Sequence, residues 1–201
     1  MALVDRAKNM ITTPKTEWAV IASEEPNTGS MVTGYALPLI LLSAIAAFIG
    51  YGFIGYSVLG VRFAGMSWGI YQAVMVLLFG LAGVFITSFV VDALAPSFSS
   101  QKDKGRAMQL VVYSMTPAWI GGILAIYPPL AWLGMLFGLY SLYLIYLGLP
   151  HTMKTPQDKI AVYMVVTIVV LIVVYAIIGV VLAGPLQRAF GLGYDLGNFR
   201  M

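Results

Sequence analysis

Five long apolar runs restrict the fold of this chain more than any other feature of its sequence. They lie at about residues 35–57, 66–91, 110–126, 130–149 and 160–183. A helix needs roughly 20 apolar residues to cross the hydrocarbon core of a bilayer, within a range of about 17–25. With 60% hydrophobic and 9% charged residues, the chain has more apolar surface than one soluble domain could bury. We therefore predict an all-α integral membrane protein, a bundle of five transmembrane helices.

Short segments flank this predicted membrane domain, which covers residues 35–183. Residues 2–11 alternate at helical spacing between a polar face and an apolar face, the latter formed by Leu3, Val4, Ala7, Met10 and Ile11. This pattern predicts a short amphipathic helix at the membrane interface, with Arg6 on its polar face. Pro14 predicts the start of a second short helix that carries Trp18 towards the lipid headgroups.

The distribution of lysine and arginine predicts the orientation of the bundle. Eight such residues would share one side: Arg6, Lys8, Lys15, Lys102, Lys104, Arg106, Lys154 and Lys159. Three would share the other: Arg62, Arg188 and Arg200. Because basic residues collect in cytoplasmic loops, residues 1–34 are predicted to be a cytoplasmic N-terminal segment. An odd number of spans then places residues 184–201, a short tail, on the non-cytoplasmic side.

Polar side chains within the predicted spans concentrate in the cytoplasmic half. Four helices place hydroxyl groups or a carboxylate at similar depth there: Thr87, Ser88, Asp92, Tyr113, Ser114, Thr116, Tyr143, Tyr146, Tyr163 and Thr167. Two interpretations fit this pattern. The hydroxyls could bond between helices while the tyrosines form an interfacial belt. Alternatively, the side chains line a polar cavity that is open to the cytoplasm and closed on the far side, which suits a docking or ligand site.

Individual residues at the ends and kinks of the spans add detail. Asp92 lies at the expected C-terminal end of a helix, where the helix dipole disfavours negative charge; it is either solvated or ion-paired, or has a functional role. Pro117 frees a backbone carbonyl that a neighbouring hydroxyl or water must satisfy. Gly134 and Gly138 form a GxxxG pair that favours close packing inside the bundle. Residues 155–158 are expected to cap the fifth helix, with Thr155 as the N-cap.

The composition argues against enzymatic and metal chemistry. The chain has no cysteine and one histidine, His151, so neither a zinc site nor a Cys–His pair can be assembled. We expect no catalytic residue, no metal and no cofactor. The net charge of +3 is spread over loops rather than gathered in one patch, which argues against a nucleic-acid partner.

Four short motifs, taken in order, resemble a known family. They are DALAPSF at residues 92–98, YSMTPAW at 113–119, YSLYLIYLGLP at 140–150 and MKTPQDK at 153–159. Over roughly residues 3–185 the chain is similar to the bacterial branch of the Yip-one domain family, the Ypt/Rab-interacting membrane proteins. The resemblance implies a five-helix membrane domain with a cytoplasmic N-terminus. The residues that match its pattern include Asp92, Pro96, Tyr113, Pro117, Tyr143 and Lys154.

The resemblance also bears on partners. Eukaryotic members act in endoplasmic reticulum and Golgi traffic and bind small GTPases, but they have a long cytoplasmic N-terminal region. Here only about 34 residues precede the first predicted helix, which argues against a GTPase-binding role.

We therefore expect a non-enzymatic, multi-pass protein of the bacterial cytoplasmic (inner) membrane that organises membrane or protein partners through its cytoplasmic face. Its partners would be the lipid bilayer and a protein or anionic lipid at basic loop residues, namely Lys102, Lys104, Arg106, His151, Lys154 and Lys159. The sequence leaves open whether the chain forms a homo-oligomer. The alternative is a transporter or channel for an ion or small solute that uses the polar cavity.

Overall fold

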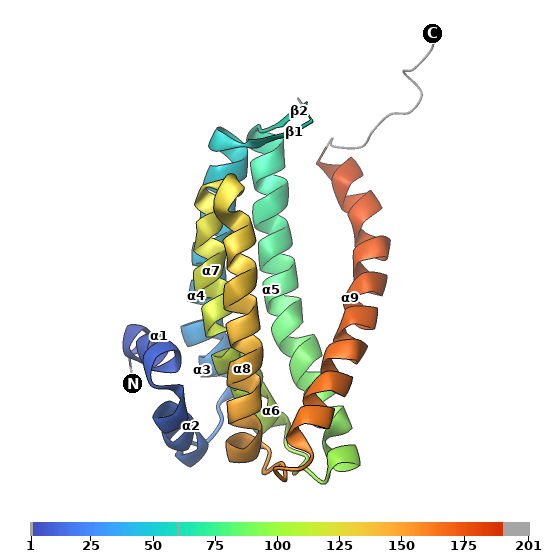
Figure 1. Ribbon diagram of the computed structural model, residues 1–201. Coiled ribbons are helices and arrows are strands. Elements are labelled where there is room, and N and C mark those ends of the chain that lie inside the picture. Colours follow the sequence, from blue (N-terminus) through green and yellow to red (C-terminus); the bar gives the residue numbers. More distant parts are fainter. Residues whose placement is uncertain (1, 60, 191–201) are drawn as a thin grey trace.

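The computed structural model of the chain describes residues 2–59 and 61–190. This part contains five helical segments that are long and apolar enough to cross a membrane, at Thr28–Ile54, Met66–Phe98, Lys104–Ile126, Pro128–Thr152 and Ile160–Val181. They stand side by side as a bundle (Figure 1). The predicted fold class, an all-α integral membrane bundle of five spans, is confirmed. Within the expected tail, residues 191–201, including Arg200, lie outside the described residues.

The first span is assembled from four helical pieces: α3 (Thr28–Met31), a π-helical turn (Val32–Ala36), α4 (Leu37–Ile49) and a second π-helical turn (Gly50–Ile54). Pro38 lies at the start of α4 and has no N–H to close a regular α-helical bond with the turn before it. A two-stranded antiparallel ribbon, β1 (Tyr56–Val58) and β2 (Val61–Phe63), follows. The sequence did not indicate this ribbon, because strands of three residues are too short to show periodicity.

The second span is the continuous helix α5 (Met66–Leu94) with a 3-10 turn (Ala95–Phe98), and the third is broken into α6 (Lys104–Ser114), α7 (Thr116–Gly122) and a 3-10 turn (Ile123–Ile126). Pro117 causes the break, since it cannot donate to the carbonyl of Tyr113 four residues earlier. The Thr116 hydroxyl donates to that carbonyl instead, at 2.7 Å. The expectation that a nearby hydroxyl satisfies the carbonyl freed by Pro117 is confirmed.

The fourth span begins with a 3-10 helix (Pro128–Leu133) and continues as α8 (Gly134–Thr152); the fifth is α9 (Ile160–Ala189). The expected cap at Thr155 is wrong. The α9 helix begins five residues later, and the Thr155 hydroxyl accepts a hydrogen bond from Ser100 at 2.9 Å instead. The first turns of α9 are buried at Ile160, Tyr163 and Thr167, after which α9 diverges from the bundle (Figure 1). Its apolar exterior suits contact with lipid tails.

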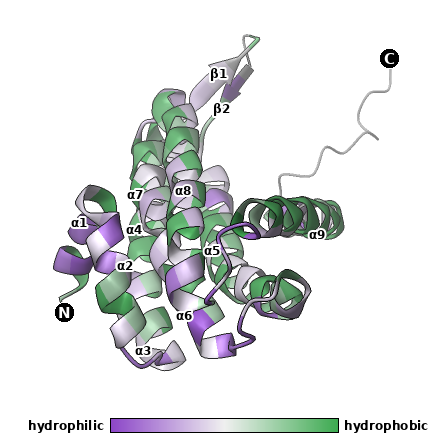
Figure 2. Cartoon of the chain, turned by 60° about the horizontal axis from the view of Figure 1, so that its bottom comes forward, coloured by the Kyte–Doolittle hydropathy of each residue, from purple (hydrophilic) through white to green (hydrophobic). Residues whose placement is uncertain are grey.

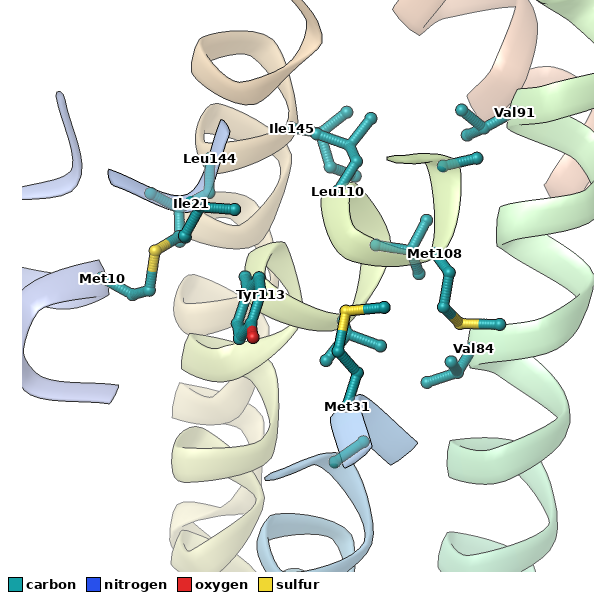
Figure 3. Packing of buried hydrophobic residues seen from close by; sticks show 14 of the residues in the cluster. Met10, Ile21, Met31, Val84, Val91, Met108, Leu110, Tyr113, Leu144 and Ile145 are labelled. Atoms are coloured by element: carbon teal, nitrogen blue, oxygen red, sulfur yellow. The ribbon is translucent and has the colours of Figure 1, made fainter. Parts of the chain in front are cut away.

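Two N-terminal helices, α1 (Leu3–Thr12) and α2 (Pro14–Ser23), pack against one end of the bundle. Figure 3 shows Met10 and Ile21 of these helices facing Leu144 of α8, with Tyr113 of α6 nearby. All four residues belong to one hydrophobic core cluster that also extends into α4 and α5. The two helices are therefore integrated into the tertiary structure; a location at the membrane interface stays a prediction.

Two expectations about these helices are wrong. Trp18 does not face headgroups but is fully buried, because Gly148 of α8 leaves room for its ring; a Cβ atom at Gly148 would lie 2.7 Å from the indole. Arg6 is not on an exposed polar face but is 4% exposed, whereas Val4 is 71% exposed. The α1 helix is rotated relative to the simple amphipathic pattern because the Arg6 charge is paired inside the protein.

Candidate functional site

A buried ion network centred on Arg6 holds the N-terminal segment together. The Arg6 guanidinium donates to the Glu17 carboxylate at 2.7 Å and also pairs with Glu24. Asn9 donates to the second oxygen of Glu17 at 2.9 Å. The guanidinium carbon lies 5.2 Å from the centre of the Tyr113 ring. Because a buried charge is tolerated only when it is paired and hydrogen-bonded, these contacts explain why α1 turns Arg6 inward.

Side chains of the bundle bind the backbone of this segment. Arg106 of α6 donates to the carbonyls of Ala22 and Glu24 at 3.1 and 2.8 Å. Gln109 donates to the carbonyl of Ile21 at 2.9 Å. These carbonyls lie at the end of α2, where the regular α-helical bonds run out, and the Ile21 carbonyl also accepts from the Glu24 amide at 3.1 Å. A cation is favourable at a helix C-terminus. From α8, the Tyr140 hydroxyl donates to the carbonyl of Ile11 in α1 at 2.8 Å.

A polar cavity of about 410 Å³ opens beside this network. Its polar lining is Arg6, Glu24, Glu25, Ser30, Tyr35 and Tyr113. Tyr35 and Tyr113 meet edge to face, with ring centres 5.0 Å apart. Tyr35 donates to Thr116 at 2.7 Å, since the single hydroxyl proton of Thr116 is used on the Tyr113 carbonyl. The cavity therefore offers mainly oxygen acceptors around an arginine that is already paired.

A second polar group lies between α5 and α9. Asp92 is 3% exposed, and its Oδ1 atom has no hydrogen-bond partner within residues 2–59 and 61–190; the same holds for the Thr167 hydroxyl. Tyr163 donates to the Val91 carbonyl and stacks on Phe98 with ring centres 4.7 Å apart. Asp92 forms no ion pair with any described residue. Burying a carboxylate without an ion pair and with one oxygen unbonded costs folding free energy.

The residues predicted to share one cavity fall into separate places. Tyr113, Ser114, Thr116 and Pro117 are buried along α6 and α7, and of these Thr116 bonds to Tyr35. Buried positions on α5 and α9 are Thr87, Ser88, Asp92, Tyr163 and Thr167. Three predicted residues are exposed: Pro96, Tyr143 and Tyr146. The sequence gives the depth of a residue along a span, but only packing decides the face on which it lies.

We did not predict from the sequence that Glu17, Glu24, Gln109 and Tyr35 belong to a site. One signal was available for Gln109, a polar residue at the edge of an apolar run. No sequence signal pairs Arg6 with Glu17 and Glu24, because those contacts depend on the angle between α1 and α2. Within the described residues, no group of three His, Asp or Glu side chains could hold a metal ion.

The two basic loops join into one surface at the end of the bundle. The Gln101 amide donates to the Met153 carbonyl at 2.7 Å, and the Ser100 hydroxyl donates to Thr155 at 2.9 Å. We call residues 99–104 and 151–159 the basic platform. Its exposed basic side chains are Lys102, Lys104, His151, Lys154 and Lys159. The adjacent Arg106 is part-buried and is used by the α2 carbonyls. Figure 2 shows hydrophilic residues concentrated in these loops and in α1, while the spans are mostly hydrophobic.

Comparison with known proteins agrees with this architecture. The family model of the Yip1 domain matches residues 8–179. The chain is also 30% identical over 152 residues to the inner membrane protein YohC of Escherichia coli, in two strains, which covers 73% of this chain and 77% of the relative. No solved structure matches the chain. Together with the five spans, these matches identify a multi-pass protein of the bacterial inner membrane.

Proposed function

Because the chain belongs to the Yip1 domain family, we propose that it organises membrane or protein partners through the basic platform, and that this platform faces the cytoplasm. The observation that carries the proposal is the bonding of two basic loops into one surface. The platform holds four exposed lysines against two aspartates, Asp103 and Asp158. Such a surface attracts anionic headgroups or an acidic protein face.

The surroundings of the platform support a stable binding surface. Met153 and Ile160 anchor its second loop in the core, and Asp103 caps α6 by accepting from the Arg106 amide at 3.0 Å. Lys154 has a φ angle of 50°, a left-handed conformation that an ordinary residue rarely adopts without local constraint. The lysine side chains thus project from a fixed backbone, which lowers the entropic cost of binding.

A crosslinking experiment in native membranes tests the proposal. A photoreactive amino acid is placed at Lys102 or at Lys154, one in each loop of the platform, and the adducts are analysed for both protein and lipid. Because the loops form one surface, both positions should capture the same partner. Charge reversal of the neighbours, Lys104→Glu with Lys159→Glu, should lower the yield.

The controls lie at the opposite end of the bundle. A photoreactive residue at Ser57, which is exposed on the β1–β2 ribbon, should not give the same adduct, and reversal of the exposed Arg62 to Glu should leave the platform adducts unchanged. Absence of any adduct from both loops, or identical adducts from Ser57, would contradict the proposal.

A further inference from the structure

Two adjoining cavities lie between the N-terminal helices and α8, away from the polar cavity and the basic platform. The first, of about 330 Å³, is lined by Ile11, Pro117, Leu136, Phe137 and Tyr140. The second, of about 370 Å³, is lined by residues 12–16, Tyr140 and Tyr143. Each falls in the range of roughly 300–1,000 Å³ that is usual for small-molecule sites. Tyr140 belongs to both linings, so the two cavities form one groove.

The character of this groove changes along α8. At its apolar end, Tyr140 is the single polar residue among the lining side chains. At the other end the lining includes three threonines and Lys15. Leu136 and Tyr143 are seven residues apart, so the groove runs along the helix for about 10 Å at 1.5 Å per residue. The polar end lies towards Thr152, where α8 reaches the basic platform.

The charge of the groove is positive and unbalanced. Lys15 is the charged residue in the two linings, and its side chain is exposed. The neighbouring Glu17 does not neutralise it, because Glu17 is buried and bound to Arg6 and Asn9. A ligand for the whole groove therefore needs an apolar chain at one end and a negative charge at the other.

We propose that this groove binds one anionic phospholipid of the surrounding bilayer, with an acyl chain against Leu136, Phe137 and Pro117 and the phosphate beside Lys15. The bilayer in which the spans lie supplies this amphiphile at high local concentration. The Tyr140 hydroxyl bonds to the Ile11 carbonyl, but this single bond leaves space between α1 and α8. The bound lipid fills that space. It thereby completes the docking of the N-terminal helices.

Native mass spectrometry of the full chain tests the site. The protein in mild detergent is mixed with phosphatidylglycerol or with phosphatidylcholine of the same acyl chains, and bound lipid is counted. The wild-type protein should retain one phosphatidylglycerol molecule in preference to phosphatidylcholine. Lys15→Glu should reduce that preference by roughly fivefold or more, the effect of one lysine near an anionic surface. Leu136→Trp, which fills the apolar end, should reduce retention of both lipids.

Each variant has a matched control. Lys8→Glu reverses an exposed charge on α1 outside both linings, and Leu139→Trp enlarges a side chain of α8 that is 63% exposed. Both controls should bind lipid as the wild type does. Equal binding by the Lys15 and Lys8 variants, or by the Leu136 and Leu139 variants, would overturn the proposal. If Leu136→Trp fails to fold, the Lys15→Glu variant still tests the proposal, because Lys15 is exposed. Disulfide-linked dimers of a Leu136→Cys variant in native membranes would also overturn it, by showing a second copy in the groove.

Discussion

At the scale of single residues, Arg6 links α1 to Glu17 of α2 and to Glu24 directly after it. Its side chain is buried together with that of Glu17, at 5% and 4% exposure. Such a pair adds little net stability compared with apolar residues of similar size, but the loss of one partner is costly, since it leaves a buried charge unpaired. Arg6 therefore fixes the position of α1 and α2 more than it raises the stability of the fold.

We expect Arg6→Ala to release the N-terminal helices from the bundle, because it leaves the Glu17 carboxylate buried without its cation. The cost of breaking a buried pair is about 3–5 kcal/mol. Hydrogen exchange of residues 3–23 and cleavage by trypsin after Lys8 or Lys15 should both accelerate strongly. Lys8→Ala removes an exposed charge and should change stability by less than about 0.5 kcal/mol.

A double replacement separates charge from docking. Arg6→Met combined with Glu17→Leu removes both charges at similar volume, so it should restore much of the protection that Arg6→Ala loses. Wild-type exchange rates in Arg6→Ala would show that the ion network does not hold the segment.

At the scale of elements, close helix contact depends on particular glycines. A Cβ atom at Gly69 of α5 would lie 2.7 Å from the Cα atom of Gly52, so backbone faces backbone where α5 meets the end of the first span. The two glycines of the predicted GxxxG pair in α8 have different packing environments. Gly134 lies near the Gly121 carbonyl, with 3.3 Å to its hypothetical Cβ, whereas a Cβ at Gly138 would meet nothing within 4 Å.

These contacts predict opposite effects for the same substitution at two positions. Gly69→Ala should destabilise the bundle by about 1–3 kcal/mol, because backbone atoms cannot move aside as a flexible side chain can. Gly138→Ala should be neutral or stabilising by about 0.5–1 kcal/mol, since alanine is the better helix former. Thermal unfolding in detergent, followed by tryptophan fluorescence, measures both; equal melting temperatures for the two variants would refute the assignment.

At the scale of the whole molecule, the bundle has two unlike ends. One end carries α2 and the basic platform, while the other carries the β1–β2 ribbon and the turn before Pro128 (Figure 1). The lysine distribution favours the platform end as the cytoplasmic one. Since the ends differ, the two sides of the membrane meet different surfaces of the molecule.

Cysteine labelling in spheroplasts tests this orientation, and the natural absence of cysteine makes single-cysteine variants unambiguous. A membrane-impermeant maleimide should label Ser57→Cys in intact spheroplasts and Lys102→Cys only after permeabilisation. Both positions are exposed, so differences in burial do not affect the comparison. Labelling of Lys102→Cys in intact spheroplasts would reverse the predicted orientation.

The sequence by itself determined the five-span class, because a bilayer requires a fixed length of apolar helix and the apolar runs are visible without any contact information. It also determined that Pro117 frees a backbone carbonyl, because the missing N–H is a property of the residue itself. Only the tertiary structure decided that Trp18 fills the space above Gly148 and that Arg6 meets Glu17 and Glu24. Depth and helical period follow from local sequence, whereas the rotation of each helix is set by packing between segments that lie far apart in the chain. Among the predicted polar residues, packing places Thr116 against Tyr35, whereas the Asp92 Oδ1 atom is buried without a hydrogen-bond partner among the described residues.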